Sequence, residues 1–227
     1  WRTFNLISVV VPALNEEENL RSAVLQIREA ARDAGNVLIE IIIVDDGSSD
    51  GTQQILKTEC TAPDTRIFFS AHNEGKGSAV RVGIREAKGD YLVIQDADLE
   101  YNPQDFVTMM NCVREKDSDV VYGSRFLNKK GVTSLWHRFV NYFLTQLCNV
   151  LFGSRLTDME TCYKLFKRSF LQGIPLQSRG FEIEVELTTK ALRAKAHIHE
   201  VPVSYHGRTY HDGKKIGWRD GVHAVQT

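Results

Sequence analysis

Short runs of β-branched residues alternate with helical patterns through the first half of the sequence. The runs at 7–11 and 38–44 are almost wholly apolar, and turn residues follow each of them. Such runs are typical of strands buried on both faces, and the helical patterns between them predict crossover connections. Further strands are expected at 66–69, 91–95 and 120–122. The alternation predicts an α/β fold with a mostly parallel sheet flanked by helices.

Capping residues predict where several helices begin and end. Asn15, with Glu18 three positions later, is expected to cap a first helix that stops at Gly35. Pro103 is expected in the first turn of a later helix. After Tyr122 we expect a partly apolar helix at 135–152, a strand at 161–166, a helix at 182–194 and a strand at 198–205. Since no linker or repeat interrupts the pattern, a single domain is expected.

Composition argues against several classes of protein. The 227 residues include 28 Lys and Arg against 29 Asp and Glu, so no basic excess points to nucleic acid. The four cysteines lie far apart, which favours reduced thiols in a cytosolic protein. No stretch is apolar enough to span a bilayer, and no signal peptide is visible. We expect a cytoplasmic protein, either soluble or peripheral to a membrane.

Acidic or glycine-rich turns follow four of the expected strands. They begin at Asn15, Asp45, Asn73 and Asp96. Ligands of parallel sheets bind at the carboxyl ends of the strands. The four turns are therefore expected to converge on one crevice.

The segment Asp96-Ala97-Asp98 is the strongest local motif. Two carboxylates just past a buried strand can face one cation, and Mg²⁺ or Mn²⁺ takes such oxygen ligands while bridging a diphosphate. Glu100 is a third candidate ligand or an outer partner of the metal. The alternative is a solvated acidic turn that caps the helix near Pro103.

Two aspartates end the second strand. Either aspartate can accept a hydrogen bond from the N–H edge of a nucleobase, and Asp46 is preferred over Asp45 as the candidate. An Asx turn and a helix cap account for the neighbouring Ser49 and Asp50. The glycines of the 73–77 turn can let the backbone approach a ligand closely, and Lys76 in this turn is a candidate donor-binding residue.

Taken in order, these motifs resemble those of family 2 glycosyltransferases, which have the Rossmann-like GT-A fold. The resemblance rests on segments 12–20, 44–48, 73–77, 96–98 and 123–126. Within that family the chain is similar to the dolichol-phosphate mannosyl- and glucosyltransferases. The resemblance implies one GT-A domain over 1–227, with a nucleotide-binding part at 1–123 and an acceptor-side part at 124–227.

The resemblance also implies roles for individual residues. The nucleoside pocket would be lined by Pro12, Leu14, Glu16 and Asp46, with Asp45 and Lys76 nearby. The metal, Mg²⁺ or Mn²⁺, would be held by Asp96, Asp98 and Glu100. The catalytic set would comprise Asp98 and four cations, Arg125, Arg138, Arg208 and Lys215, and segment 158–164 would line the sugar side.

The implied reaction is an inverting, metal-dependent transfer of a hexose from GDP-mannose or UDP-glucose to a polyprenyl phosphate of the dolichyl type. A phosphate monoester is largely a dianion at neutral pH, so it needs no general base. The implied partners are the nucleotide sugar, the lipid acceptor and the cytosolic face of a membrane, and a membrane-anchoring subunit is a further candidate.

Two other functions stay open from the sequence. One is a family 2 enzyme that acts on a sugar hydroxyl of a polysaccharide or glycolipid, for which Glu182 is the candidate general base. The other is a non-catalytic nucleotide-sugar-binding module. The helix at 135–152 likewise fits two positions, either packed in the core or lying in a membrane interface beside a lipid tail.

Overall fold

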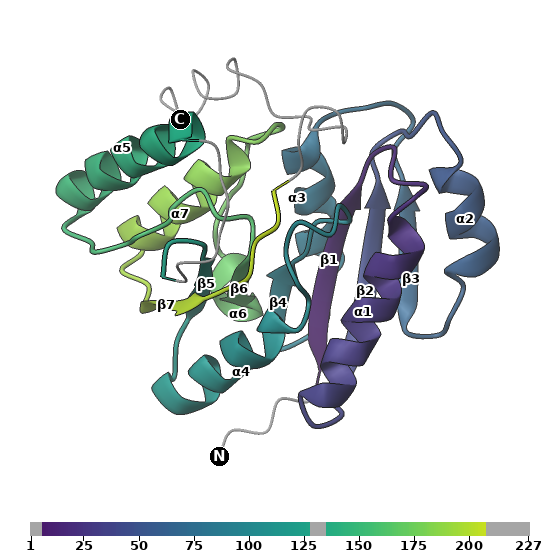
Figure 1. The fold of residues 1–227 in the computed structure, drawn as a ribbon, viewed down its shortest axis with the longest axis horizontal. Helices are drawn as coiled ribbons and strands as arrows, with labels where there is room; N and C mark the ends of the chain where they lie inside the picture. Colours follow the sequence, from purple (N-terminus) through teal and green to yellow (C-terminus); the bar gives the residue numbers. More distant parts are fainter. Residues whose placement is uncertain (1–5, 128–134, 208–227) are drawn as a thin grey trace.

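The computed structural model describes residues 6–127 and 135–207, in which a seven-stranded sheet has the order β3-β2-β1-β4-β6-β5-β7 (Figure 1). The strands are β1 (Ile7–Ala13), β2 (Ile39–Asp45), β3 (Thr65–Phe69), β4 (Tyr91–Ile94), β5 (Val120–Ser124), β6 (Lys164–Lys167) and β7 (Ile198–Pro202). Every neighbouring pair is parallel except the two that involve β6, which runs antiparallel to β4 and β5. The prediction of a mostly parallel α/β sheet is confirmed.

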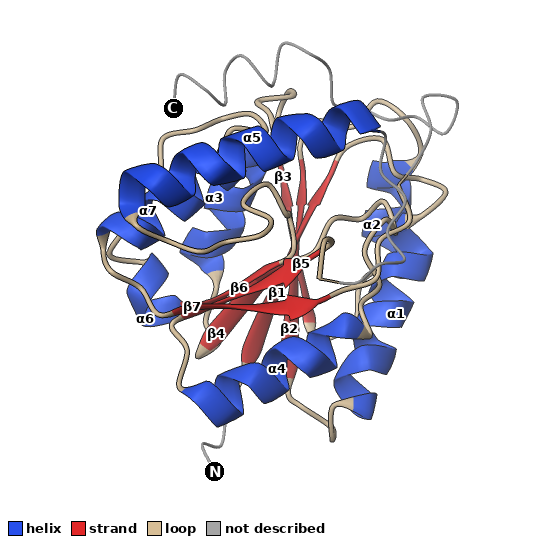
Figure 2. Cartoon of the chain, turned by 60° about the vertical axis from the view of Figure 1, so that its left-hand side comes forward, coloured by secondary structure: helices blue, strands red, loops and turns tan. Residues whose placement is uncertain are grey.

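Helices cover both faces of this sheet (Figure 2). They are α1 (Leu20–Asp33), α2 (Thr52–Glu59), α3 (Lys76–Glu86), α4 (Asp105–Lys116), α5 (Leu135–Phe152), α6 (Arg168–Leu171) and α7 (Ile183–Arg193). Side chains of α1, α2 and α4 pack with Val9 and Val11, whereas those of α3, α5, α6 and α7 pack with Val10. Successive residues of a strand point to opposite faces, so the molecule has three layers with a core on each side of the sheet.

The predicted cap of the first helix is wrong. The helix α1 begins at Leu20, and its N-cap is Asn19. Asn15 instead has a φ of 51°, and its side-chain oxygen accepts a hydrogen bond from the N–H of Ser49 at 2.8 Å. The predicted stop at Gly35 is confirmed, since this residue follows the helix with a φ of 90°, which glycine adopts easily.

Three other predicted boundaries are corrected by the structure. Pro103 lies outside α4, which begins at Asp105 after the N-cap Gln104. The strand predicted from 161 begins only at Lys164, because the Thr161 hydroxyl donates to the carbonyl of Gly123 at 2.6 Å and holds the chain in a turn. The last strand ends at Pro202, which has no N–H to extend a ladder. Between residues 203 and 207 the chain makes an isolated bridge, which joins residues 205 and 101.

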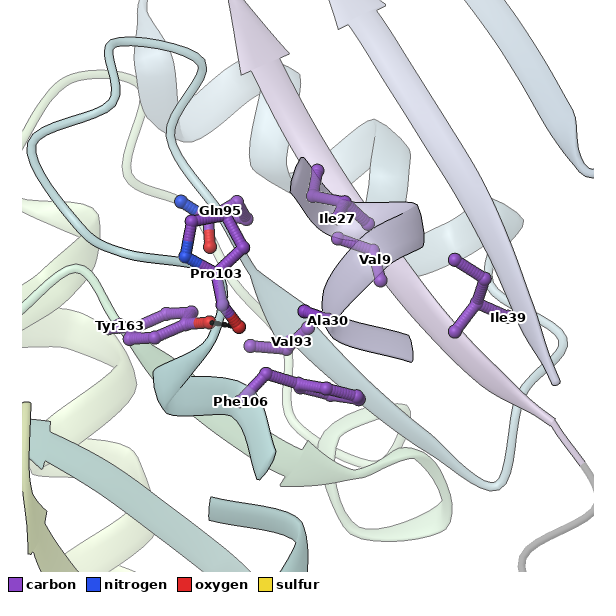
Figure 3. A pocket seen from close by; sticks show the side chains of 9 residues that line it. All are labelled: Val9, Ile27, Ala30, Ile39, Val93, Gln95, Pro103, Phe106 and Tyr163. Carbon is purple, nitrogen blue, oxygen red and sulfur yellow. Dashed lines mark hydrogen bonds between the residues drawn. The ribbon is translucent and has the colours of Figure 1, made fainter. Parts of the chain in front are cut away.

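A small cavity lies in the core between α1, α4 and the sheet (Figure 3). Most of its lining is apolar, including Val9, Ile27 and Phe106, and the hydroxyl of Tyr163 donates to the carbonyl of Pro103 beside it at 3.4 Å. Its volume of about 10 Å³ is close to the least that one water needs. It is therefore a packing defect of the core and too small for a nucleotide, a sugar or a lipid.

All four cysteines, Cys60, Cys112, Cys148 and Cys162, are free thiols. Within residues 6–127 and 135–207, no helix combines the length and the apolar character needed to cross a membrane.

Candidate active site

The turns after β1, β2 and β3 are joined to one another by hydrogen bonds at the carboxyl ends of these strands (Figure 1). The N–H of Asn15 donates to the hydroxyl of Ser48 at 2.9 Å, which joins the first turn to the second. The carboxylate of Asp46 accepts hydrogen bonds from the N–H groups of Glu74 at 3.0 Å and Gly75 at 2.8 Å, which joins the second turn to the third. The predicted convergence of these turns is confirmed.

A row of four buried charges connects the fourth turn to the rest of the site. Lys76, the first residue of α3, lies 2.9 Å from Asp96 after β4 and 3.2 Å from Glu184 in the first turn of α7. Glu184 in turn lies 2.6 Å from Lys164 on β6. We call Asp96, Lys76, Glu184 and Lys164 the ion-pair row. Its side chains are 16%, 9%, 5% and 0% exposed, so water screens these charges weakly.

Opposite neighbours shift the pKa values of the two central members of the row, Lys76 and Glu184, in the direction that keeps them charged. Desolvation alone would lower the pKa of Lys76, but the nearby Asp96 and Glu184 raise that pKa well above its usual value. Desolvation would likewise raise the pKa of Glu184, but Lys164 and Lys76 outweigh it and lower that pKa. A glutamate held in this way is a weak proton acceptor.

The two aspartates at the end of β2 differ in what they bind. Asp46 is 3% exposed, and both of its oxygens are committed to the backbone of the following loop; desolvation raises its pKa. Asp45 is fully buried, and its Oδ2 accepts a hydrogen bond from the side-chain amide of Gln53 at 2.9 Å. Among the described residues its Oδ1 has no hydrogen-bond partner. Asp45 thus has one carboxylate oxygen without a hydrogen-bond partner in this part of the chain, whereas both oxygens of Asp46 accept hydrogen bonds.

Three of the predicted nucleoside-pocket residues lie at the end of β1 and on the turn that follows it. Pro12 and Leu14 are half-buried, whereas Glu16 is only 6% exposed. The N–H of Glu16 donates to the hydroxyl of Thr52 at 2.8 Å, and its carboxylate accepts from the side chain of Asn19 at 3.0 Å. Glu16 therefore helps to fix the start of α1 beside the second turn.

The carboxylates of the fourth turn do not gather into one cluster. The Oδ1 of Asp98 accepts a hydrogen bond from the N–H of Glu100 at 3.0 Å, across Leu99 with its φ of 62°. The carboxylate of Glu100 accepts from the hydroxyl of Tyr205 at 2.7 Å. In the described part of the chain, no three His, Cys, Asp or Glu side chains are close enough together to hold a metal. Asp96 and Asp98 remain the candidate metal-binding pair.

Arg125, which follows β5, makes a buried ion pair. Its guanidinium donates to both oxygens of Asp158, each at 2.7 Å, and lies 5.2 Å from the ring centroid of Tyr205. The side-chain amide of Asn141 on α5 donates to the same carboxylate at 2.6 Å. Desolvation would raise the pKa of Asp158, but Arg125 lowers it. Arg125 thus fixes segment 158–164 to the end of β5.

Of the other predicted acceptor-side cations, Arg138 lies within the described part of the chain. Arg138 is exposed near the N-terminal end of α5, one turn before Asn141. Arg208 and Lys215 lie outside the described residues.

Sequence reasoning named Glu182 as the residue of interest on α7, but Glu184 is the one that enters the ion-pair row. The carboxylate of Glu182 accepts hydrogen bonds from the N–H groups of Arg179 at 3.0 Å and Gly180 at 2.9 Å, so it closes the turn before the helix. Alternating glutamates gave no indication of which one faces inward. The signal that could have indicated a buried carboxylate partner was Lys164, a charged residue within a predicted strand.

Glu160 is a second residue whose individual role sequence reasoning missed. It is half-buried between Asp158 and Thr161, and desolvation raises its pKa. A raised pKa makes this carboxylate a better proton acceptor than Glu184.

The glycines of the third turn serve the protein rather than a ligand. A Cβ on Gly77 would lie 2.6 Å from the carbonyl oxygen of Ser178, and one on Gly75 would overlap the backbone of Arg179. The turn can approach segment 178–180 this closely only because both residues lack a side chain.

Comparison with known proteins agrees with this geometry. Residues 8–174 match the family model described as glycosyl transferase family 2. The chain is 28% identical over 219 residues to the low-salt glycan biosynthesis hexosyltransferase Agl6 of Haloferax volcanii, covering 94% of this chain and 51% of that protein. It is 26% identical over 221 residues to the undecaprenyl-phosphate mannosyltransferase of Micrococcus luteus, covering 93% and 88%. The chain thus spans about half the length of the first relative and most of the second.

The fold is similar to a solved structure of glucosyl-3-phosphoglycerate synthase from Mycobacterium tuberculosis in complex with Mn²⁺, uridine diphosphate and phosphoglyceric acid. The TM-score is 0.71 at 18% identity, and the match covers 97% of this chain and 76% of that one. This likeness confirms the predicted fold. By its family match and its three-layer architecture, the chain belongs to glycosyl transferase family 2 and has the GT-A fold.

Proposed function

We propose that the chain transfers a hexose from a nucleotide sugar to a polyprenyl phosphate, with inversion at the anomeric carbon. An oxygen of the acceptor phosphate forms a bond to this carbon while the bond to the donor diphosphate breaks. The nucleoside diphosphate leaves with the electron pair of that bond. The similarity to the undecaprenyl-phosphate mannosyltransferase of Micrococcus luteus supports a lipid phosphate as acceptor.

The state of Glu184 is the observation that carries this choice of acceptor. A sugar hydroxyl is protonated at neutral pH, so an enzyme that uses one needs a general base, whereas a phosphate dianion does not. Glu184 is the α7 glutamate nearest the fourth turn, and two lysines hold it ionised with a lowered pKa. It is suited to fixing Lys76, and through it Asp96, rather than to taking a proton.

The donor would lie across the turns after β1, β2 and β4. The unpartnered Oδ1 of Asp45 would accept a hydrogen bond from the base, beside Pro12 and Leu14. Asp96 and Asp98 supply hard oxygen ligands that fit Mg²⁺ or Mn²⁺, with the remaining ligands coming from the donor diphosphate and water. When bound, the cation would neutralise charge on the leaving diphosphate.

A transfer assay tests this function. The chain would be incubated with radiolabelled GDP-mannose or UDP-glucose, Mn²⁺ and either a short polyprenyl phosphate or the corresponding polyprenol. Label is expected in the organic phase with the phosphate only. Product from the polyprenol at a similar rate would refute the phosphate acceptor. A thermal-shift screen of both nucleotide sugars would then identify the donor, because a ligand that binds only the folded state raises the melting temperature.

Glu160 keeps the hydroxyl-acceptor function as a second candidate. Its raised pKa and its place beside the Arg125–Asp158 pair suit a general base. Glu160→Gln should leave transfer to polyprenyl phosphate within about threefold of the unmodified rate, whereas loss of a general base typically costs about a hundredfold or more. A hundredfold loss would show that the reaction needs this carboxylate as a base, which contradicts the argument for an ionised phosphate acceptor.

A further inference from the structure

The helix α5 carries its large apolar side chains on the outside. It lies at the margin of the molecule and packs against α7 (Figures 1 and 2). Six large apolar side chains on it are 40% to 81% exposed: Phe139, Tyr142, Phe143, Leu147, Val150 and Leu151. They recur at intervals of three and four residues, so they form one stripe along the helix. We call these six residues the outer stripe.

The inner face of the same helix is unusually polar. Asn141 and Thr145 are 3% and 0% exposed, and they lie beside the buried Leu144 and Cys148. The hydroxyl of Thr145 donates to the side-chain oxygen of Asn141 at 2.9 Å, and Asn141 donates to Asp158. A surface helix normally buries its apolar face and exposes its polar one. Here the outer face carries large apolar side chains as well, and a contiguous exposed apolar stripe of this kind marks an interaction site.

The charges around the outer stripe identify the kind of partner. Between residues 135 and 155 the sequence has no Asp or Glu. Exposed arginines lie at both ends of the stripe, with Arg138 at the start of the helix and Arg155 just after it. A third exposed arginine, Arg193 of α7, lies 5.9 Å from the ring centroid of Phe152. An apolar stripe that carries no acidic residue between positions 135 and 155 and has three exposed arginines beside it is complementary to an anionic lipid surface.

We propose that the outer stripe of α5 docks the protein on the anionic surface of a lipid bilayer. Its aromatic and aliphatic side chains would enter the boundary between headgroups and acyl chains, while the three arginines contact lipid phosphates. The helix joins this surface to the candidate active site, since Asn141 on its inner face bonds the carboxylate that holds Arg125. The docking would deepen the proposed function by bringing the acceptor side of the site to the membrane, but the surface itself is argued without reference to any acceptor.

Vesicle flotation without any nucleotide sugar or polyprenyl phosphate tests the docking. The chain should float with vesicles of phosphatidylcholine and phosphatidylglycerol. Phe143→Ser should lower the partition coefficient about tenfold or more, because a buried Phe side chain contributes that much to partitioning. Val150→Asp should lower it further, since it adds a charge that the lipid repels. Binding to phosphatidylcholine alone should be weaker by about fivefold for each arginine that reaches the surface.

Leu25→Ser is the matched control. Leu25 lies on α1 and is 58% exposed, close to the 56% of Phe143, so its replacement removes a similar apolar surface from another face. The control should float like the unmodified chain. Equal flotation of Phe143→Ser, Val150→Asp and the control would overturn the proposal.

Two further measurements separate lipid from other partners. If light scattering shows a dimer that Val150→Asp converts to a monomer while flotation is unchanged, a second copy covers the stripe and the proposal fails. It also fails if Phe143→Ser lowers the melting temperature far more than Leu25→Ser, because the chain itself would then cover the stripe. Flotation without transfer would refute only the proposed function, and transfer to a detergent-dispersed acceptor without flotation would refute only the docking.

Discussion

Replacing Glu184 with glutamine should destabilise the protein by about 3–5 kcal/mol, the usual cost of breaking a buried ion pair from one side. The substitution keeps the shape of the side chain and removes its charge. The carboxylate is 5% exposed and lies 2.6 Å from the ammonium of Lys164 and 3.2 Å from that of Lys76. Without it, the fully buried Lys164 keeps its hydrogen bond to the carbonyl of Thr161 but loses the carboxylate with which it forms an ion pair.

The distances set the size of the effect. At an effective dielectric constant of about 20, the Coulomb attraction is about 6 kcal/mol for the shorter pair and about 5 kcal/mol for the longer one. The desolvation of three charges and the repulsion between the two lysines offset much of this attraction in the unmodified protein. The substitution therefore lowers the free energy of unfolding by less than the sum of the two attractions. The decrease is still larger than the decrease from breaking an exposed ion pair.

Urea unfolding at neutral pH measures this loss, with Glu186→Gln as the matched control. Glu186 lies on the same helix and is 6% exposed at the side chain, but its partner Lys190 is 25% exposed, and backbone N–H groups of residues 177 and 178 supply its other contacts. The control should lose about 1–2 kcal/mol.

A double variant extends the test. Adding Lys164→Met to Glu184→Gln should restore part of the stability, because it removes the stranded charge, and the coupling between the two sites should be about 1–3 kcal/mol. If Glu184→Gln loses no more than the control and shows no coupling to Lys164, the ion-pair row does not hold the site together.

Two further predictions concern acid stability and the second turn. The pKa values of Glu184 and Asp158 are lowered in the fold, so their contribution is complete above their usual values of 4.5 and 3.8 and is lost as the pH falls through the lower folded values. Urea midpoints should therefore drop in acid, less steeply for Glu184→Gln, and an equally steep fall would contradict this assignment. Gly47→Ala should cost more than Gly35→Ala in the same assay: both have positive φ, but only at Gly47 would a Cβ meet backbone, 2.5 Å from the carbonyl carbon of His72. Equal losses would show that backbone strain alone, worth about 1 kcal/mol, matters there.

Strands β1, β2, β4 and β5 were predictable because each is a short apolar run followed by turn residues. This pattern is local in the sequence, and it arises because these strands are buried on both faces of the sheet. The cap at Asn15 was not predictable. Its side chain binds Ser49, 34 residues away, and no local propensity reports such a contact.

The candidate site was likewise predictable only in part. Its location at the ends of the strands follows from sheet topology, so the turns at Asp46 and Asp96 could be grouped in advance. Their partners could not, because the pairing of Lys76 with Asp96 and of Arg125 with Asp158 depends on how segments far apart in sequence pack. The outer stripe was visible as an apolar segment, but only the structure distinguishes its exposed face from its buried one.

The rate of hexose transfer to polyprenyl phosphate by Asp98→Asn, relative to the unmodified chain, tests the central claim most directly. Asparagine keeps the oxygen that accepts the hydrogen bond from Glu100 and removes the charge that would help to hold a divalent cation. We predict a fall on the order of a hundredfold, with an unchanged urea midpoint, because charge neutralisation by the cation is worth several kcal/mol. An undiminished rate would contradict the assignment of this carboxylate to the reaction.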